Sequence, residues 1–277
     1  MQDAPEPDVS SLVVHAMAMP FTVHLRGIRD PSAADDAVRA FGESLREADA
    51  LLSLWRPETP MSRVARGELS VDDAAPEIAE VLALAERWRQ ATDGAFDARL
   101  RRRAAARLPV TYPDGAPDPT GIVKAWAVAR ALPLLADAGS EAWLVDAAGD
   151  VSTWGRGPWR VGIADPAVRG APAGTRPIDV ITLRQGFAAL ATSGGAQSTD
   201  HLWDPVTGDV ARHYLQVSVA GDDLVMCDAW ATAIAAGGPV TLALAAARGI
   251  AALAVVAGRS TGGYDAVSTP GWPRLRY

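Results

Sequence analysis

Apolar residues recur at helical spacing in three long stretches of the first half of the chain. These stretches predict helices over residues 31–55, 76–93 and 122–136. Pro31 and Pro76 stand at the start of the first two, where proline costs no helical hydrogen bond. The inward face of the first helix is predicted to carry Val38, Phe41, Leu45, Ala48 and Leu52.

The second half of the chain consists mostly of short apolar runs between turn residues, which predict β-strands. The predicted strands cover residues 141–147, 159–163, 178–183, 186–192, 215–219 and 251–256. Before the last of them, residues 228–237 predict a buried helix of small residues, and a further helix starts at Pro239.

Two loops and the N-terminal segment complete the predicted order of elements. Residues 11–25 predict a strand pair or one long strand. Residues 56–67, with Pro57 and Pro60 as breakers, and residues 112–120 are predicted to be loops. Helices followed by strands favour an α+β fold over alternating βαβ units. We therefore predict one large domain over residues 11–277, after a flexible tail of residues 1–10.

Composition and charge exclude several classes of protein. The net charge of −7 argues against a general nucleic-acid binder, which needs a basic face, and the arginine-rich residues 99–107 are interpreted as a solvated face. The single cysteine, Cys227, excludes an intrachain disulfide and a cysteine zinc site. The glycine patterns of Rossmann and P-loop nucleotide sites are absent, which argues against both folds.

The sequence also bears on where the protein works. The first ten residues are polar and acidic, with no basic start and no apolar run, so no signal peptide is expected. We see no apolar stretch of membrane-spanning length. The expectation is a soluble cytoplasmic protein without membrane insertion; a secreted precursor that has lost its leader is the alternative.

Lysine is nearly absent from this chain. Of the 26 lysine and arginine residues, only Lys124 is lysine. Arginine replaces lysine on most solvated surfaces, but not where a compact ammonium must act as a point charge. Lys124 is therefore a candidate ligand-binding residue, and the alternative is a chance codon on a solvated helix turn.

Asp228 and Thr232 form a candidate magnesium site. Four residues apart on a helix, they share one face and offer two hard oxygens to one cation. The alternative is that Asp228 caps the helix and Thr232 bonds back to a carbonyl.

Several further patterns suit a ligand, and each has a structural alternative. Thr192 and Ser193 precede two glycines, which suits an anion or a tight turn. His201 and Asp204 lie beside a turn, where a histidine can exchange protons or be structural. Asp150 ends a short Ala-Gly turn where a ligand can approach the backbone, although a plain β-turn has the same sequence.

The segment 92–97, with sequence T-D-G-A-F-D, is the last of these patterns. Phe96 can stack on a flat ring and Asp97 can accept a hydrogen bond from it, although the segment also suits a plain helix end.

Together and in this order, the motifs resemble those of the ApbE family of FAD:protein FMN transferases, over residues 15–260. The specific blocks are T-D-G-A-F-D at 92–97, H-x-x-D-P-x-T-G at 201–208 and D-A-x-x-T at 228–232. The resemblance implies a single α+β domain with mixed or antiparallel sheets flanked by helices. It also implies that Mg²⁺ lies on the diphosphate of FAD, and that FMN is moved to a threonine hydroxyl of an acceptor protein with release of AMP.

The resemblance also assigns residues by matching position. Magnesium would be held by the carbonyl of Gly121 and by Asp228 and Thr232. His201 is the candidate acceptor of the hydroxyl proton, and Asp204 is the second candidate. The implied FAD contacts are Met17, Trp55, Ala95, Phe96, Asp97, Lys124, Thr192, Ser193 and His201, to which we add Asp150 from its own turn.

The chain departs from the family pattern at a few positions. Ala18 stands where the family has glycine in Met-Gly-Thr, and Ala125 stands where glycine follows the lysine. Ala148 replaces the first glycine of Gly-Gly-Asp, and Ala65 replaces an asparagine. Two alternatives to a transferase therefore stay open, namely an FAD pyrophosphatase with water as acceptor and a non-catalytic FAD-binding protein.

Overall fold

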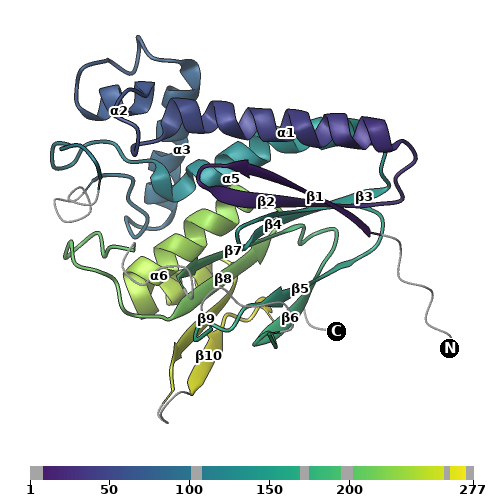
Figure 1. Ribbon diagram of the computed structural model, residues 1–277. Coiled ribbons are helices and arrows are strands. Elements are labelled where there is room, and N and C mark those ends of the chain that lie inside the picture. Colours follow the sequence, from purple (N-terminus) through teal and green to yellow (C-terminus); the bar gives the residue numbers. More distant parts are fainter. Residues whose placement is uncertain (1–8, 101–107, 169–174, 195–201, 259–262, 273–277) are drawn as a thin grey trace.

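An eight-stranded sheet separates a layer of helices from a second, two-stranded sheet (Figure 1). The computed structural model describes residues 9–100, 108–168, 175–194, 202–258 and 263–272. Within these residues all strand pairs are antiparallel, and the large sheet has the order β1-β2-β3-β4-β7-β8-β9-β10. The predicted α+β class with antiparallel sheets is confirmed.

The elements have the following bounds. The strands are β1 Val9–Ala16, β2 Met19–Arg26, β3 Ala142–Ala147, β4 Asp150–Gly155, β5 Trp159–Ile163, β6 Asp179–Leu183, β7 Ala189–Gly194, β8 Gln216–Gly221, β9 Ala251–Ala257 and β10 Tyr264–Ser268. The helices are α1 Pro31–Leu52, α2 Pro60–Ala65, α3 Pro76–Ala91, α5 Thr120–Ala131, the 3₁₀ helix η1 Leu132–Ala138 and α6 Leu224–Ala247.

Helix α1 forms where its apolar spacing predicted it. Asp30 caps its first turn by accepting hydrogen bonds from the backbone N–H groups of Ser32 (3.0 Å) and Ala33 (3.2 Å), and Pro31 occupies the first helical position. All five residues predicted for its inward face are buried. In Figure 1, α1 runs along β1 and β2 with α5 beside it, and α6 covers β7 and β8.

Strands β3, β7, β8 and β9 of the large sheet are buried on both faces. Along β3, Trp143 and Val145 belong to the core under the helices, while Ala142 and Leu144 face the β5–β6 sheet. Alternate residues of a strand point to opposite faces, so one strand serves both cores. The near-continuous apolar sequence of β3 follows from this position between two layers.

Helix α6 is the central helix of the fold. Asp223 caps it by accepting from the N–H groups of Val225 (2.8 Å) and Met226 (3.1 Å). Gly238 has φ 68° and ψ −150°, so the helix is interrupted just before Pro239, and the prediction of two successive helices is confirmed.

In length and composition α6 matches a membrane-spanning helix, alone among the helices of the described residues. The expectation that the chain contains no such segment is therefore wrong on those two criteria. Buried core helices of soluble proteins have the same composition, and 61% of the most apolar window of α6 is buried in this fold.

The structure corrects several sequence-based boundaries. The predicted loop 56–67 contains α2, because Pro60 begins a helix that Thr59 caps instead of breaking one. The strands β4 and β10 were not predicted, and the third helix changes to 3₁₀ geometry at Leu132. The first strand begins at Val9, inside the range assigned to the tail.

Candidate functional site

A cavity of about 530 Å³ opens where the helix layer meets the end of β7. The described residues that line it come from five regions: the loop after α1, the segment after α3, the first turns of α5 with the loop before them, the end of β7 with the loop 202–205, and the part of α6 before Gly238. Segments far apart in the sequence therefore form one site, and its chemistry depends on the side chains that they direct inward.

Asp228 is the most unusual side chain in this cavity. It is only 7% exposed, yet its carboxylate accepts no hydrogen bond from any of the described residues. Burial and the nearby charge of Asp150 raise the pKa of Asp228 well above its ordinary value, and Lys124 opposes the shift only in part. Because Asp223 caps α6, the alternative explanation of Asp228 as a helix cap is wrong.

Thr232 follows Asp228 one helical turn later and lines the same cavity. Its hydroxyl lies 3.0 Å from that of Ser193 on β7, so the two chain segments meet at this point. A buried carboxylate without a hydrogen-bond donor, beside a hydroxyl, is a donor set that suits a hard divalent cation.

No group of three or more His, Cys, Asp or Glu side chains suited to a metal occurs in the described part of the chain. A cation held by Asp228 and Thr232 would need further oxygens from the backbone, from water or from a phosphate group. Mg²⁺ accepts such a mixed set, since it commonly binds through one or two carboxylates plus substrate phosphates.

Lys124 lies on α5 and lines the cavity. Its ammonium is 2.9 Å from the carboxylate of Asp150, and its side chain is 23% exposed. Burial alone would lower the pKa of Lys124, but Asp150 and Asp228 outweigh it and the pKa is raised. The alternative of a solvated lysine on a helix surface is therefore wrong.

Asp150 lies behind Lys124 and does not line the cavity. Its carboxylate is 1% exposed, and its second oxygen accepts a hydrogen bond from the N–H of Thr192 at 3.1 Å. The sequence-based assignment of Asp150 as a direct cofactor contact is thus not supported, because Lys124 and β7 cover it.

The segment after α3 forms the apolar wall of the cavity. Thr92 fixes it, because its hydroxyl accepts a hydrogen bond from the N–H of Phe96 at 2.9 Å. Phe96 is buried in the wall, whereas Trp55 at the rim is 58% exposed. The site thus offers both aromatic surface and charged groups to a ligand.

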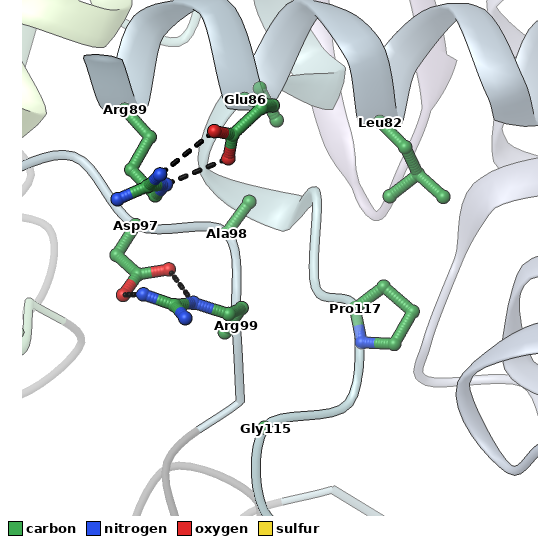
Figure 2. A pocket seen from close by; sticks show the side chains of 9 residues that line it. Leu82, Glu86, Arg89, Asp97, Ala98, Arg99, Gly115 and Pro117 are labelled. Carbon is green, nitrogen blue, oxygen red and sulfur yellow. Dashed lines mark hydrogen bonds and ion pairs between the residues drawn. The ribbon is translucent and has the colours of Figure 1, made fainter. Parts of the chain in front are cut away.

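A smaller cavity of about 220 Å³ lies on the other side of the same segment and shares Asp97 and Arg99 with the first. Figure 2 shows its charged side chains in pairs. Arg99 holds Asp97 with two hydrogen bonds of 2.6 and 2.7 Å, and Arg89 holds Glu86 in the same way. Because its charges are neutralised within these pairs, the smaller cavity is a weaker candidate for an ionic ligand.

The sequence model of the ApbE family matches residues 17–107 and 99–254, which together are most of the chain. The chain belongs to the ApbE family. No curated protein matches it significantly.

Solved structures of ApbE proteins have the same fold. The flavinyl transferase ApbE of Pseudomonas stutzeri, in its apo form, is 22% identical over 99% of both chains, with a TM-score of 0.79. The flavin transferase ApbE of Vibrio cholerae is 20% identical over 97% of this chain and 99% of its own (TM-score 0.75). The ApbE protein of Thermotoga maritima is 20% identical over 98% and 100% (TM-score 0.76).

Most of the residues assigned from the ApbE motifs meet in the larger cavity. Its lining includes Trp55, Ala95, Phe96, Asp97, Gly121, Lys124, Thr192, Ser193, Asp228 and Thr232. Their individual roles stay predictions, but the structure brings them to one place from five separate elements and loops.

Besides Asp150, two of the assigned residues that the structure describes are not in that lining. Met17 lies in the β1–β2 turn and packs against the main core. Asp204 uses one carboxylate oxygen to accept from the N–H groups of Val206 (2.8 Å) and Thr207 (3.2 Å), which gives it a structural role in its own turn. His201 lies outside the described residues.

Other residues that line the larger cavity were not predicted from the sequence, among them Asp118 and Trp203. Burial raises the pKa of Asp118, and Thr120 donates hydrogen bonds to it from its N–H (3.0 Å) and its hydroxyl. The signal was present, because Asp118 is an acid shortly before Lys124 in a Pro-rich segment, but residues 112–120 were predicted only to be a loop.

Proposed function

We propose that this chain is a magnesium-dependent FAD:protein FMN transferase. It would cleave the diphosphate of FAD, join FMN to a threonine hydroxyl of an acceptor protein and release AMP. The observation that carries this proposal is the buried carboxylate of Asp228, which has no hydrogen-bond donor and shares a cavity with Lys124 in a chain of the ApbE family. ApbE proteins of Pseudomonas stutzeri and Vibrio cholerae are named flavinyl or flavin transferases.

The residues of the cavity suit a substrate with a flat ring at one end and a diphosphate at the other. Trp55 and Phe96 would contact the flavin ring, while Lys124 would place positive charge near the phosphates. Ser193 and Thr192, at the end of β7, would donate to phosphate oxygens.

Asp228, Thr232 and the carbonyl of Gly121 would hold Mg²⁺ next to the diphosphate. When bound, the ion neutralises phosphate oxygens and stabilises the leaving group. Transfer of a phosphoryl-type group needs little covalent help from the protein, so the main task of these side chains is to position charge.

The transfer step forms one bond, breaks one bond and needs one base to accept a proton. The acceptor hydroxyl oxygen bonds to the phosphorus of the FMN half, the bond from that phosphorus to the bridging oxygen breaks, and AMP leaves with the bond's electrons. The hydroxyl proton needs an acceptor, and we propose His201 for it. The hydrogen bonds of the Asp204 carboxylate within its own turn favour His201 over Asp204.

We further propose that the protein acts in the cytoplasm, with FAD and an acceptor protein as its partners. The net charge of −7 supports a function without nucleic acid. The buried position of α6 supports a function without membrane insertion.

Incubation with FAD, Mg²⁺ and candidate acceptor proteins tests the proposal. A transferase releases AMP and adds the FMN mass to an acceptor, as read by chromatography and intact-protein mass spectrometry. Free FMN with AMP, and no modified acceptor, would instead show an FAD pyrophosphatase. Intact FAD that stays bound when Mg²⁺ is added would show a flavin-binding protein without turnover.

Substitution of the proposed metal ligand makes the test specific to this site. Asp228→Asn should lower Mg²⁺-dependent FAD turnover by more than about 100-fold, because even residues that only support a metal ligand contribute about 10–100-fold. The matched control is Asp222→Asn, an exposed acid just before the same helix, which should leave turnover unchanged. Equal turnover in the two variants would remove the metal assignment.

A further inference from the structure

We propose that Asp150 is a positioning residue that holds the ammonium of Lys124 away from Asp228 and so keeps the Asp228 carboxylate free for a divalent cation. This inference rests on the proposed function, because it concerns the same metal site. It assigns Asp150 an indirect role through Lys124 and no contact with the substrate.

Two carboxylates lie near the ammonium of Lys124: Asp150 in direct contact with it, and Asp228 in the same cavity. Lys124 on α5 and Asp228 on α6 line the same cavity, while Asp150 lies behind Lys124 at 2.9 Å from its ammonium. Asp228 is close enough to act electrostatically on Lys124. Nevertheless, of these two carboxylates only that of Asp150 forms an ion pair with Lys124.

Asp150 is itself held firmly. It is almost completely buried, and the N–H of Thr192 donates to its other oxygen at 3.1 Å. The ion pair therefore ties α5 to the start of β4 and to β7. A carboxylate with one fixed orientation gives a flexible lysine side chain one preferred position.

Without Asp150, the ammonium would be a buried charge without its partner. A buried charge that loses its partner is strongly unfavourable, so the ammonium would turn to another carboxylate. Asp228 is such a carboxylate in the same cavity, and an ion pair there would occupy the oxygens that a cation needs. The ammonium would then compete with the metal.

The test is a double-mutant cycle read by direct binding of Mn²⁺, without FAD and without turnover. Free Mn²⁺ is followed by electron paramagnetic resonance during titration of the wild-type protein, Asp150→Asn, Lys124→Met and the double variant. Asparagine keeps the oxygen that accepts from Thr192, so Asp150→Asn removes mainly the charge. Thermal unfolding of each variant verifies that it is folded at the titration temperature.

Lys124→Met should change Mn²⁺ affinity differently in the wild-type protein and in the Asp150→Asn variant. Asp150→Asn alone should weaken Mn²⁺ binding by about tenfold or more, an effect of the size seen for directly coupled residues. Lys124→Met should then tighten Mn²⁺ binding by about tenfold in the Asp150→Asn background, but by less than about threefold in the wild-type background. Such a difference shows competition by the ammonium, since a simple loss of charge would act equally in both backgrounds.

Asp146→Asn serves as the matched control. Asp146 also acts electrostatically on Lys124, but its carboxylate accepts from the N–H of Gly149 (2.9 Å) and forms no ion pair with the lysine. Its effect on Mn²⁺ affinity should be additive with that of Lys124→Met. Equal effects of Lys124→Met with and without Asp150 would overturn the positioning role while leaving the metal site intact. A wild-type protein that binds no Mn²⁺ in the absence of FAD would overturn this inference alone, because the phosphate oxygens of FAD would still complete the metal site of the proposed transferase.

Discussion

At the scale of single residues, Ala18 adopts a backbone conformation that costs energy. It has φ 58° and follows Met17 at φ 50°, and these two residues form the turn between β1 and β2. A two-residue hairpin turn of type I′ requires positive φ at both positions, and glycine is favoured there. The departure from the family pattern at Ala18 is therefore a local strain, because the turn itself is kept.

We accordingly expect Ala18→Gly to stabilise the protein. Relief of the left-handed conformation should contribute about 1 kcal/mol, which corresponds to a rise in Tm of roughly 2 °C for a chain of this size. Differential scanning calorimetry measures it. Ala40→Gly, in the middle of α1, is the opposite control and should lower Tm, since glycine costs about 1 kcal/mol inside a helix. A lower Tm for Ala18→Gly would contradict the interpretation that the backbone of Ala18 is strained.

At the scale of elements, the interruption of α6 is imposed by packing. Gly238 has φ 68° and ψ −150°, a region open essentially only to glycine, and a Cβ added there would lie 2.7 Å from Cγ of His213. The loop before β8 therefore passes directly over the kink. The break was predicted correctly from the sequence, as a new helix starting at Pro239, but nothing in the sequence indicated the histidine that fills the space.

Gly238→Ala should destabilise the protein by about 2 kcal/mol or more, because backbone strain adds to the clash with His213. Urea denaturation measures the change. Gly249→Ala is the matched control: Gly249 has φ 75° but nothing within 4 Å of the added Cβ, so only about 1 kcal/mol of strain is expected. The double variant Gly238→Ala with His213→Ala should recover the difference caused by the clash. If Gly238→Ala and Gly249→Ala lower the free energy of unfolding equally, the close approach of His213 has no effect on stability.

At the scale of the whole molecule, the candidate site reduces the stability of the fold. The pKa of Asp228 is raised in the folded protein, so the unfolded chain releases this proton at a lower pH than the folded chain does. The unfolding free energy therefore falls as pH rises from the ordinary pKa of aspartate, about 4, towards the raised value. Exposed acids with a lowered pKa, such as Glu86 at about 2, have the opposite effect only below their ordinary pKa.

The fall of the unfolding free energy with rising pH gives a prediction for the metal-free protein above pH 5. Asp228→Asn should be more stable than the wild-type protein, and the difference should grow with pH by at most about 1.4 kcal/mol per pH unit. Urea denaturation at a series of pH values measures it, with Asp222→Asn as the variant that should stay parallel to wild type. Parallel curves for Asp228→Asn would show that Asp228 ionises normally in the folded state.

Much of the architecture was determined by sequence, because periodicity and end signals act locally. The spacing from Val38 to Leu52 specified the buried face of α1, and Pro31 with Asp30 specified its start. The strands β4 and β10 were missed for a physical reason. Residues 150–155 are mostly small or polar, and β10 is exposed along its whole length, so neither has the apolar alternation that marks a half-buried strand.

The residues of the candidate site can likewise be separated into features that the sequence determined and features that depend on the tertiary structure. The sequence by itself determined that Asp228 and Thr232 share a helix face and that Lys124 is the only lysine, since both follow from residue order. Only the tertiary structure decided that Asp228 lacks a hydrogen-bond donor, that Asp150 pairs with Lys124 behind the cavity, and that Asp204 bonds within its own turn. Desolvation and the choice of ion-pair partner depend on all the segments packed around a group. A local pattern in the sequence does not contain this information.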